Sequence, residues 1–276
     1  MPATVALLFP GQGSQHPGMD EPHRGNPLFE RGLELLGYDP FERLGEGTRY
    51  HQPALFLCSA VECDSWDGDP GDVLAAAGHS LGEYCALYAA GALAFDDAVR
   101  LVDARAAAMA EAAKRNPGSM VAMLGGDDHA IRALAATLGL TVANDNAPGQ
   151  LVLSGALDAI GAVEERAEET GARARRLEVG GAFHSPLMQP AAAKLGAALE
   201  STPINALRFT VYSNGSAAPF VDIRRELAEN LLKPVRFRET LLALRAAGAE
   251  RYVELGPGQV LTGLVKRTLR SVEAPA

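Results

Sequence analysis

Short apolar runs alternate with longer helical stretches along most of this 276-residue chain. The first run covers residues 5–9 and stops at Pro10-Gly11, and the second covers residues 72–78 and stops in a glycine-rich turn. Strands that are apolar along their whole length and alternate with helices are typical of a parallel sheet covered on both faces. We therefore predict an α/β fold with a parallel sheet at the core of one large domain.

The remaining elements of this large domain follow from apolar periodicity and from capping residues. We expect further strands over residues 209–213 and 251–255. We expect helices over residues 53–63, 81–90, 97–114, 186–200, 236–247 and 260–269. The helix over 97–114 should begin after Asp96, because aspartate is a favoured N-cap residue.

The middle of the chain has a different order of elements. We expect strands over residues 119–125, 140–143, 150–154 and 174–179, and helices over residues 128–138 and 157–170. The order β-α-β-β-α-β is that of a ferredoxin-like unit. We therefore place a ferredoxin-like subdomain at residues 119–181, inserted in a large α/β-hydrolase-like domain made of residues 1–118 and 182–276.

Charge and cysteine content exclude several classes of function. The net charge is −9, and no run of lysine or arginine offers a surface for nucleic acid or an anionic membrane. No apolar stretch approaches the roughly 18 residues of a membrane span, and the N-terminus lacks the basic region of a signal peptide. Cys58, Cys63 and Cys85 are odd in number and form no C-x-x-C pair, which indicates reduced thiols in a cytoplasmic protein.

Residues 78–82, GHSLG, match the pattern G-x-S-x-G between a predicted strand and a predicted helix. In such a turn the glycines allow a sharp bend that exposes the serine hydroxyl at the N-terminus of the helix. Backbone N–H groups and the helix dipole there favour a developing oxyanion. Ser80 is therefore a candidate nucleophile, and the alternative is a plain glycine-rich connection.

A serine nucleophile needs a base, and histidine is the usual one. His79 adjoins Ser80 in sequence, so we expect its side chain to point away from the hydroxyl. Three other histidines lie in polar surroundings and are expected to be exposed: His23, His51 and His129. His184 lies in a glycine-rich loop after the inserted segment, which could bring its imidazole to the mouth of the large domain.

Arg105 lies on the apolar face of its predicted helix, together with Leu101, Val102 and Met109. An arginine in such a place needs an anion, because an unpaired buried charge is costly. The anion could be a substrate. The alternatives are a carboxylate within the protein, or a guanidinium that reaches solvent along the helix surface.

The loop over residues 9–15, FPGQGSQ, sets polar groups at the end of the first strand. Ligands of α/β sheets bind beyond the carboxyl ends of the strands. The loop lacks the G-K-[ST] ending of a phosphate loop, so it is either a turn or part of a site that binds something else.

Together these segments resemble the malonyl-CoA:acyl carrier protein transacylases of fatty acid synthesis and the acyltransferases of polyketide synthases. The matching stretches occur in family order along nearly the whole chain: residues 9–15, 52–54, 78–83, 105 with 109, 146–150, 181–188, 234–237, and 256–258 with 261. The resemblance implies transfer of a malonyl group from coenzyme A to the phosphopantetheine thiol of an acyl carrier protein. It implies no metal and no redox cofactor.

The resemblance also implies a catalytic set. Ser80 would be the nucleophile and His184 its base. The main-chain carbonyl of Asn230 would orient the imidazole, in place of the acidic residue of ordinary α/β-hydrolases. The backbone N–H groups of Gln12 and Leu81 would form the oxyanion hole.

For substrate binding, the resemblance implies that Arg105 pairs with the free carboxylate of malonate, a two-point contact. Gln52 would line the same pocket, and Phe183 would crowd the α-methyl group of methylmalonate. The matched positions Met109 and Asn146 complete the predicted substrate-binding residues. The stretch from Met19 to Gln52 is shorter than in the family, which is compatible with a discrete acyltransferase that acts in trans.

Carrier proteins are usually acidic, and this chain is acidic too, so a docking patch must be local. The candidates are Arg173, Arg175, Arg176, Lys233, Arg236, Lys266 and Arg267. Three other functions remain open from the sequence. They are a thioesterase-like hydrolase, the acyltransferase component of malonate decarboxylase, and a docking module without activity.

Overall fold

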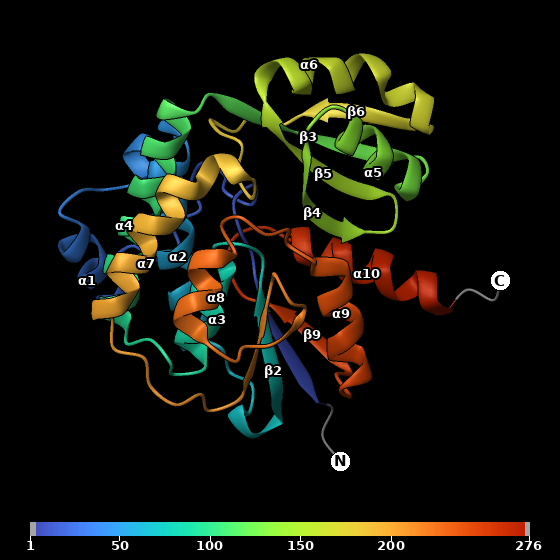
Figure 1. The fold of residues 1–276 in the computed structure, drawn as a ribbon. Coiled ribbons are helices and arrows are strands. Elements are labelled where there is room, and N and C mark those ends of the chain that lie inside the picture. The colour runs from blue at the N-terminus through green and yellow to red at the C-terminus, as the bar shows by residue number, and fades with distance from the viewer. Residues whose placement is uncertain (1–3, 274–276) are drawn as a thin grey trace.

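The computed structural model describes residues 4–273 and contains two separate β-sheets (Figure 1). The larger sheet has the strand order β8-β7-β2-β1-β9. Its strands are β1 (Val5–Phe9), β2 (Val73–Gly78), β7 (Thr210–Ser213), β8 (Ala218–Pro219) and β9 (Arg251–Glu254). All neighbouring strands pair in parallel except β8, which is an antiparallel edge strand.

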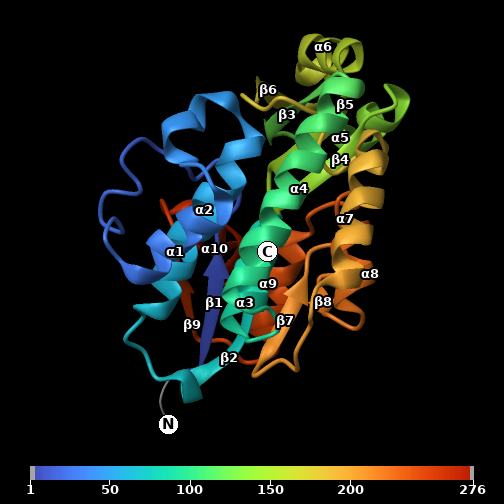
Figure 2. The same ribbon diagram turned by 90° about the vertical axis from the view of Figure 1, so that its left-hand side faces the viewer.

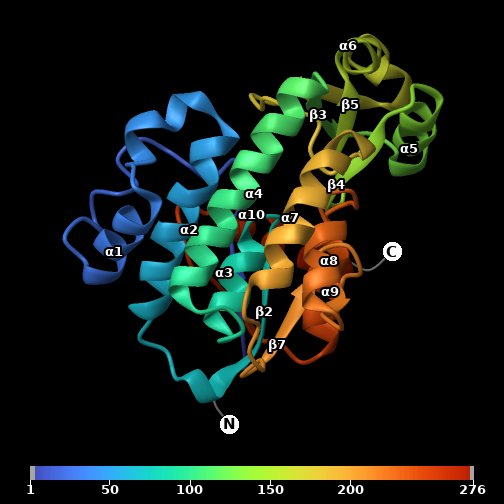
Figure 3. The same ribbon diagram turned by 60° about the vertical axis from the view of Figure 1, so that its left-hand side comes forward.

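Helices cover both faces of the parallel sheet (Figure 2). One face carries α1 (Pro27–Leu36), α2 (Thr48–Asp64), α3 (Gly82–Ala89), α4 (Phe95–Arg115), α7 (Gln189–Ser201) and α8 (Ile223–Glu229). The other face carries α9 (Phe237–Ala246) and α10 (Val260–Glu273). Figure 3 shows α4 and α7 side by side across the first face.

Strand β1 shows why the sheet is buried on both faces. Val5, Leu7 and Phe9 belong to the core that contains α2, α3 and α4. Ala6 and Leu8 belong to the core under α9 and α10. Because side chains alternate along a strand, an uninterrupted apolar run supplies both cores, as the sequence predicted.

The inserted segment forms the second sheet, which is antiparallel and has the strand order β4-β5-β3-β6. Its elements are β3 (Gly118–Gly125), α5 (Asp128–Thr137), β4 (Thr141–Ala147), β5 (Gln150–Ala156), α6 (Leu157–Arg166) and β6 (Ala172–Arg176). Both helices pack on one face around a separate core. Met120, Ala122 and Val152 on the opposite face join the core of the large domain.

The insert is also joined to the large domain through the backbone. The N–H of Asp145 in β4 donates to the carbonyl of Val235 at 2.9 Å, and the N–H of Val235 donates to the carbonyl of Ala143 at 2.8 Å. The segment that contains Val235 also carries Asn230, so the insert is attached next to a predicted site residue.

The predicted start of the helix over 97–114 is wrong. α4 begins at Phe95, and Ala94 is its N-cap residue without a side-chain hydrogen bond. Asp96 and Asp97 lie in the first turn, where carboxylates are stabilised by the helix dipole. Asp96 also pairs with Arg31 of α1 at 2.7 Å, a partner that the local sequence does not reveal.

Other elements differ from prediction mainly in their ends. The helix predicted over 53–63 starts at Thr48, so Pro53 lies inside it, and burial of most of its side chains outweighs the lost hydrogen bond. The strand predicted over 174–179 is β6, which ends at Arg176. Helices α1 and α8 were not predicted. No helix in the described part of the chain is long and apolar enough to cross a membrane.

Candidate active site

Ser80 lies at the sharp turn between β2 and α3 and has a positive φ of 52°. The turn needs its two glycines. A Cβ on Gly78 would lie 1.8 Å from the carbonyl carbon of Gly82, and one on Gly82 would lie 2.0 Å from the carbonyl oxygen of Phe9. The side chain of Asn214 spans the bend, since its Oδ1 accepts from the Ser80 N–H at 2.7 Å and its Nδ2 donates to the Gly78 carbonyl at 2.6 Å.

His184 brings its imidazole to this serine from a loop 104 residues away in sequence. Its Nε2 lies 2.8 Å from the Ser80 Oγ. Its Nδ1 lies 2.8 Å from the carbonyl oxygen of Asn230 and 3.1 Å from that of Lys233. Because carbonyl oxygens only accept, Nδ1 carries the proton and the lone pair of Nε2 faces the serine hydroxyl.

The surroundings of His184 keep it neutral. Burial and, next, the positive charge of Arg105 lower the pKa of its imidazole to about 4. The two carbonyl oxygens at Nδ1 oppose this shift only in part. A neutral imidazole is the form that can take a proton from serine.

We expect the acid limb of the pH dependence of Ser80 acylation to lie near pH 4. With its pKa lowered from 6.5 to about 4, His184 remains a proton acceptor throughout the range above pH 4 and loses that capacity as the pH falls through 4. The measurement is the rate of acyl-enzyme formation from about pH 3 to about pH 8, which extends about one unit below the expected pKa. A limb near pH 6.5 would contradict the expectation.

That experiment needs a folding control, because the same pKa shift affects stability. Between pH 6.5 and 4 the unfolded chain binds a proton at His184 that the folded chain does not, so the free energy of unfolding falls as the pH falls. Circular dichroism at each pH separates loss of the base from loss of the fold.

Arg105 is 3% exposed and lies beside the nucleophile. One guanidinium nitrogen donates to the Ser80 Oγ at 2.9 Å, and another donates to the Oε1 of Gln52. The central carbon of the guanidinium lies 5.4 Å from the centroid of the Tyr84 ring. Among residues 4–273, Nε has no hydrogen-bond partner.

The burial of Arg105 excludes a guanidinium that reaches solvent, which is one of the two alternatives to a substrate anion. The other is excluded as well, because no carboxylate of residues 4–273 forms an ion pair with Arg105. Tyr84 and Glu83 act on Arg105 electrostatically without forming an ion pair, and burial raises the pKa of the Glu83 carboxyl to about 8. Arg105 is thus a buried cation that an external anion could neutralise.

Gln12 and Leu81 are the residues predicted to form the oxyanion hole. Both line the cavity that contains Ser80 and His184. Within the described chain, neither backbone N–H donates a hydrogen bond to a protein acceptor. Two free N–H groups beside a nucleophile can bind an oxyanion; their participation stays a prediction.

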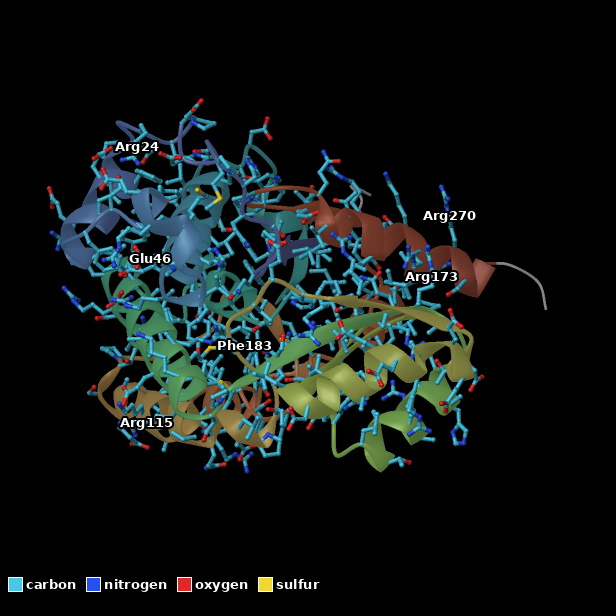
Figure 4. All side chains as sticks on the ribbon, turned by 90° about the horizontal axis from the view of Figure 1, so that it is seen from above. Arg24, Glu46, Arg115, Arg173, Phe183 and Arg270 are labelled. Atoms are coloured by element: carbon cyan, nitrogen blue, oxygen red, sulfur yellow. The ribbon has the colours of Figure 1, made fainter. Side chains whose placement is uncertain are left out.

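The cavity lies between the large domain and the insert. Figure 4 shows Phe183, one of its lining residues, near the middle of the molecule in a view from above. Gln52 and Met109 line it too; their contact with substrate stays a prediction. The insert and the segment that follows it supply lining residues that the sequence did not reveal: Met120, Asn144, Leu177 and Val179.

Asn146 is placed differently from the other predicted substrate-binding residues. It does not line the cavity, and its Oδ1 lies 2.8 Å from the Nε2 of His79. His79 does line the cavity. Asn146 thus supports the residue next to the nucleophile, and direct contact with substrate stays a prediction.

Other histidines depart from expectation. His23 and His51 are each only 8% exposed, although polar neighbours in sequence predicted exposure. His23 lies 3.6 Å from a carboxylate oxygen of Glu62, and the Nε2 of His51 lies 2.6 Å from the carbonyl of Leu44. Sequence reasoning also missed Asn214, which no motif marked.

The sequence matches the acyl transferase domain family over residues 40–276. The chain is 40% identical to the malonyl CoA-acyl carrier protein transacylase of Bacillus subtilis (strain 168), over 99% of this chain and 92% of that protein. It is 38% identical to the polyketide biosynthesis protein ThaF of Burkholderia thailandensis, over 96% of this chain but only 24% of ThaF.

Solved structures agree with these sequence relatives. A malonyl-transacylase in complex with its type II polyketide synthase acyl-carrier protein superposes with a TM-score of 0.91 at 34% identity, over 97% of this chain and 94% of that one. The malonyl CoA-acyl carrier protein transacylase of Coxiella burnetii also gives a TM-score of 0.91, at 35% identity, over 98% and 92% of the two chains.

Proposed function

Because this chain belongs to the acyl transferase domain family, we propose that it is a malonyl-CoA:acyl carrier protein transacylase that works through an acyl-serine. It acts in fatty acid or polyketide biosynthesis. The observation that carries the proposal is one constellation: Ser80 and His184 lie 2.8 Å apart, and the buried cation of Arg105 lies 2.9 Å from the same hydroxyl.

The first half-reaction loads the enzyme. Nε2 of His184 takes the proton of the Ser80 hydroxyl while Oγ bonds to the thioester carbon of malonyl-CoA. The carbonyl oxygen becomes an oxyanion between the N–H groups of Gln12 and Leu81, and such donors contribute about 3–4 kcal/mol each. The C–S bond then breaks, and the coenzyme A thiolate takes the proton from His184, which leaves malonyl-Ser80.

The second half-reaction is the reverse, with a different thiol. His184 takes the proton of the carrier's phosphopantetheine thiol, and the sulfur attacks the carbonyl carbon of malonyl-Ser80. When the C–Oγ bond breaks, Ser80 recovers its proton from the imidazole. No redox change occurs, because one thioester is exchanged for another.

Malonyl selection follows from the buried guanidinium. A carboxylate can accept two parallel N–H bonds from arginine, and such a pair is strong in a site shielded from water. Gln52, hydrogen-bonded to Arg105, fixes the orientation of the fork. Phe183 in the cavity wall crowds an α-methyl group, although one methyl changes binding by only about 1–3 kcal/mol.

The docking surface for the carrier is a patch of arginines and a lysine on β6 of the insert and on α10. Several candidates already pair with acidic neighbours: Arg176 with Glu164, Lys233 with Glu229, and Arg236 with Glu239. The exposed residues without an ion pair in the described chain are Arg173, Arg175, Lys266 and Arg267. A groove lined by Gln12 and Arg175 passes from this patch toward the loop over 9–15.

Two finer features complete the proposal. The insert is ferredoxin-like, supported by its β-α-β-β-α-β order and by the strand order β4-β5-β3-β6. The large domain is α/β-hydrolase-like, supported by the serine elbow after a central parallel strand.

The cysteines Cys58, Cys63 and Cys85 are free, which suits a cytoplasmic enzyme.

The proposal is tested by incubating the protein with malonyl-, methylmalonyl-, acetyl- and succinyl-CoA and measuring the mass added to Ser80. We expect malonyl-CoA to acylate Ser80 fastest, and an added holo acyl carrier protein to remove the malonyl group as malonyl-carrier. Rapid release of free malonate without carrier would instead indicate the thioesterase-like hydrolase. Absence of any acylation would contradict the proposal.

A further inference from the structure

Glu83 is a buried carboxyl group that the reaction itself does not use. It lies three residues after Ser80, in the first turn of α3, and is 2% exposed. Burying a group of this kind is costly unless its oxygens accept hydrogen bonds. Its Oε1 accepts two hydrogen bonds, and each donor residue also binds one of the two loops that carry the reacting groups.

The first hydrogen bond leads to the nucleophile. The backbone N–H of Asn214 donates to the Oε1 of Glu83 at 2.7 Å. The side chain of the same asparagine binds the Ser80 N–H and the Gly78 carbonyl, at 2.7 and 2.6 Å. Glu83 therefore fixes the backbone from which the elbow of Ser80 is held.

The second hydrogen bond leads to the base. The side-chain amide of Asn230 donates to the same Oε1 of Glu83 at 2.9 Å and to the Oγ of Ser213 at 3.1 Å. The main-chain carbonyl of Asn230 accepts from the Nδ1 of His184 at 2.8 Å. Glu83 therefore also fixes the segment that orients the imidazole.

Both loops need such support. Ser80 and His184 have positive φ values of 52° and 55°, a region that residues other than glycine rarely adopt. Strained backbone of this kind persists only where several contacts with the surrounding structure hold it in place. We propose that Glu83 is a positioning residue whose Oε1 holds the Ser80 elbow and the His184 loop at one fixed separation.

The chemistry of Glu83 makes this role testable. Burial is the main cause that raises the pKa of its carboxyl to about 8, and Glu226 of α8 adds to the rise. The hydrogen bond from Asn214, the charge of Arg105 and the hydrogen bond from Asn230 oppose it only in part. At neutral pH the group is mainly a neutral acid that accepts through Oε1. Glutamine has nearly the same volume as glutamate and an Oε1 at the same position, so it should perform the role of Glu83. Methionine fills the same space but has no oxygen there to accept the two hydrogen bonds.

This inference rests on the proposed function, and its test separates the two. We would compare wild type with Glu83→Gln and Glu83→Met, and measure the single-turnover rate of Ser80 acylation by malonyl-CoA together with the rate of covalent labelling of Ser80 by a fluorophosphonate. We expect Glu83→Met to lose about 100-fold in both rates, because misplacement by about 1 Å costs that much. Glu83→Gln should stay within about fivefold, and the malonyl-CoA concentration at half-maximal rate should change less than threefold in either variant.

Glu226→Ala is the matched control. Glu226 is also buried, at 9% exposed, and it affects Glu83 through its charge. Its Oε1, however, accepts from the N–H groups of Val221 and Asp222, which belong to neither the Ser80 elbow nor the His184 loop. It should lose stability to a similar extent as Glu83→Met and keep its labelling rate. Equal loss of rate in Glu226→Ala and Glu83→Met would mean that Glu83 is merely structural and would overturn the inference.

If Glu83→Met does not fold, Asn230→Ala tests the second of the two hydrogen bonds of Glu83, the one that connects it to His184. It keeps the main-chain carbonyl that His184 uses and removes the amide that binds Glu83. A labelling rate equal to wild type would overturn the inference. A wild-type protein that reacts with the fluorophosphonate but not with malonyl-CoA would contradict the proposed function and leave the Glu83 comparison readable.

Discussion

Replacing Ser80 with alanine should abolish the malonyl-enzyme and lower malonyl transfer to the carrier protein by a factor of about 10⁴ or more. The Ser80 hydroxyl is the proposed site of the covalent intermediate, and it lies 2.8 Å from the Nε2 of His184 in an elbow that presents it to the cavity. Intact-protein mass spectrometry after mixing with malonyl-CoA measures the intermediate, and transfer of labelled malonyl groups measures the turnover.

The elbow should survive this substitution, because its bend depends on Gly78, Gly82 and the backbone clasp by Asn214. Ser80→Ala should therefore unfold within a few degrees of the wild type. Ser185→Ala is a useful companion: Ser185 is a buried serine next to His184, and its hydroxyl donates to the Ala182 carbonyl at 2.7 Å. A malonyl adduct that persists in Ser80→Ala would refute the assignment of the nucleophile.

Replacing Arg105 with alanine should lower kcat/KM for malonyl-CoA by a factor of about 30 to 1,000, since removing one partner of a buried charge pair costs about 2–4 kcal/mol. The same variant should accept acetyl-CoA as well as or better than the wild type, because a neutral acyl group no longer meets a buried charge. The measurement is the ratio of the two kcat/KM values.

Two further variants test whether the expected loss of malonyl preference depends on the planar fork of Arg105 and on its position in the helix. Arg105→Lys keeps the charge but not the planar fork, so it should recover only part of the malonyl preference. Arg100→Ala removes an arginine from the exposed side of the same helix, where Arg100 lies close to Asp96 and Asp97, and should change neither kcat/KM. If Arg105→Ala still prefers malonyl-CoA as strongly as the wild type, another group binds the carboxylate.

Much of the fold could be predicted because local patterns carry it. The apolar run over residues 5–9 predicted a strand buried on both faces, and the G-x-S-x-G turn predicted where Ser80 would lie. The order of elements in the insert predicted a separate small sheet, and the structure contains a separate four-stranded antiparallel sheet there. In each case the signal lies within one continuous segment of the chain.

The errors arose where distant residues decide. Asp96 was predicted as an N-cap residue, but it lies in the first turn of α4 and forms an ion pair with Arg31. His23 and His51 have polar neighbours in sequence, yet both are buried, with His23 beside Glu62 of α2 and His51 beside the carbonyl of Leu44. Asn214 carries no motif, and its importance appears only when β7 lies beside β2 and brings it to the elbow.

The sequence by itself determined the types of chemical group in the site: a hydroxyl on a tight turn, an imidazole in a glycine-rich loop, and a guanidinium on an apolar helix face. Only the tertiary structure decided that these three meet at one hydroxyl oxygen, and that Glu83 connects the loops that carry two of them. The physical reason is that pairing among strands from distant parts of the chain sets the distances, whereas sequence neighbours set only the local backbone shape.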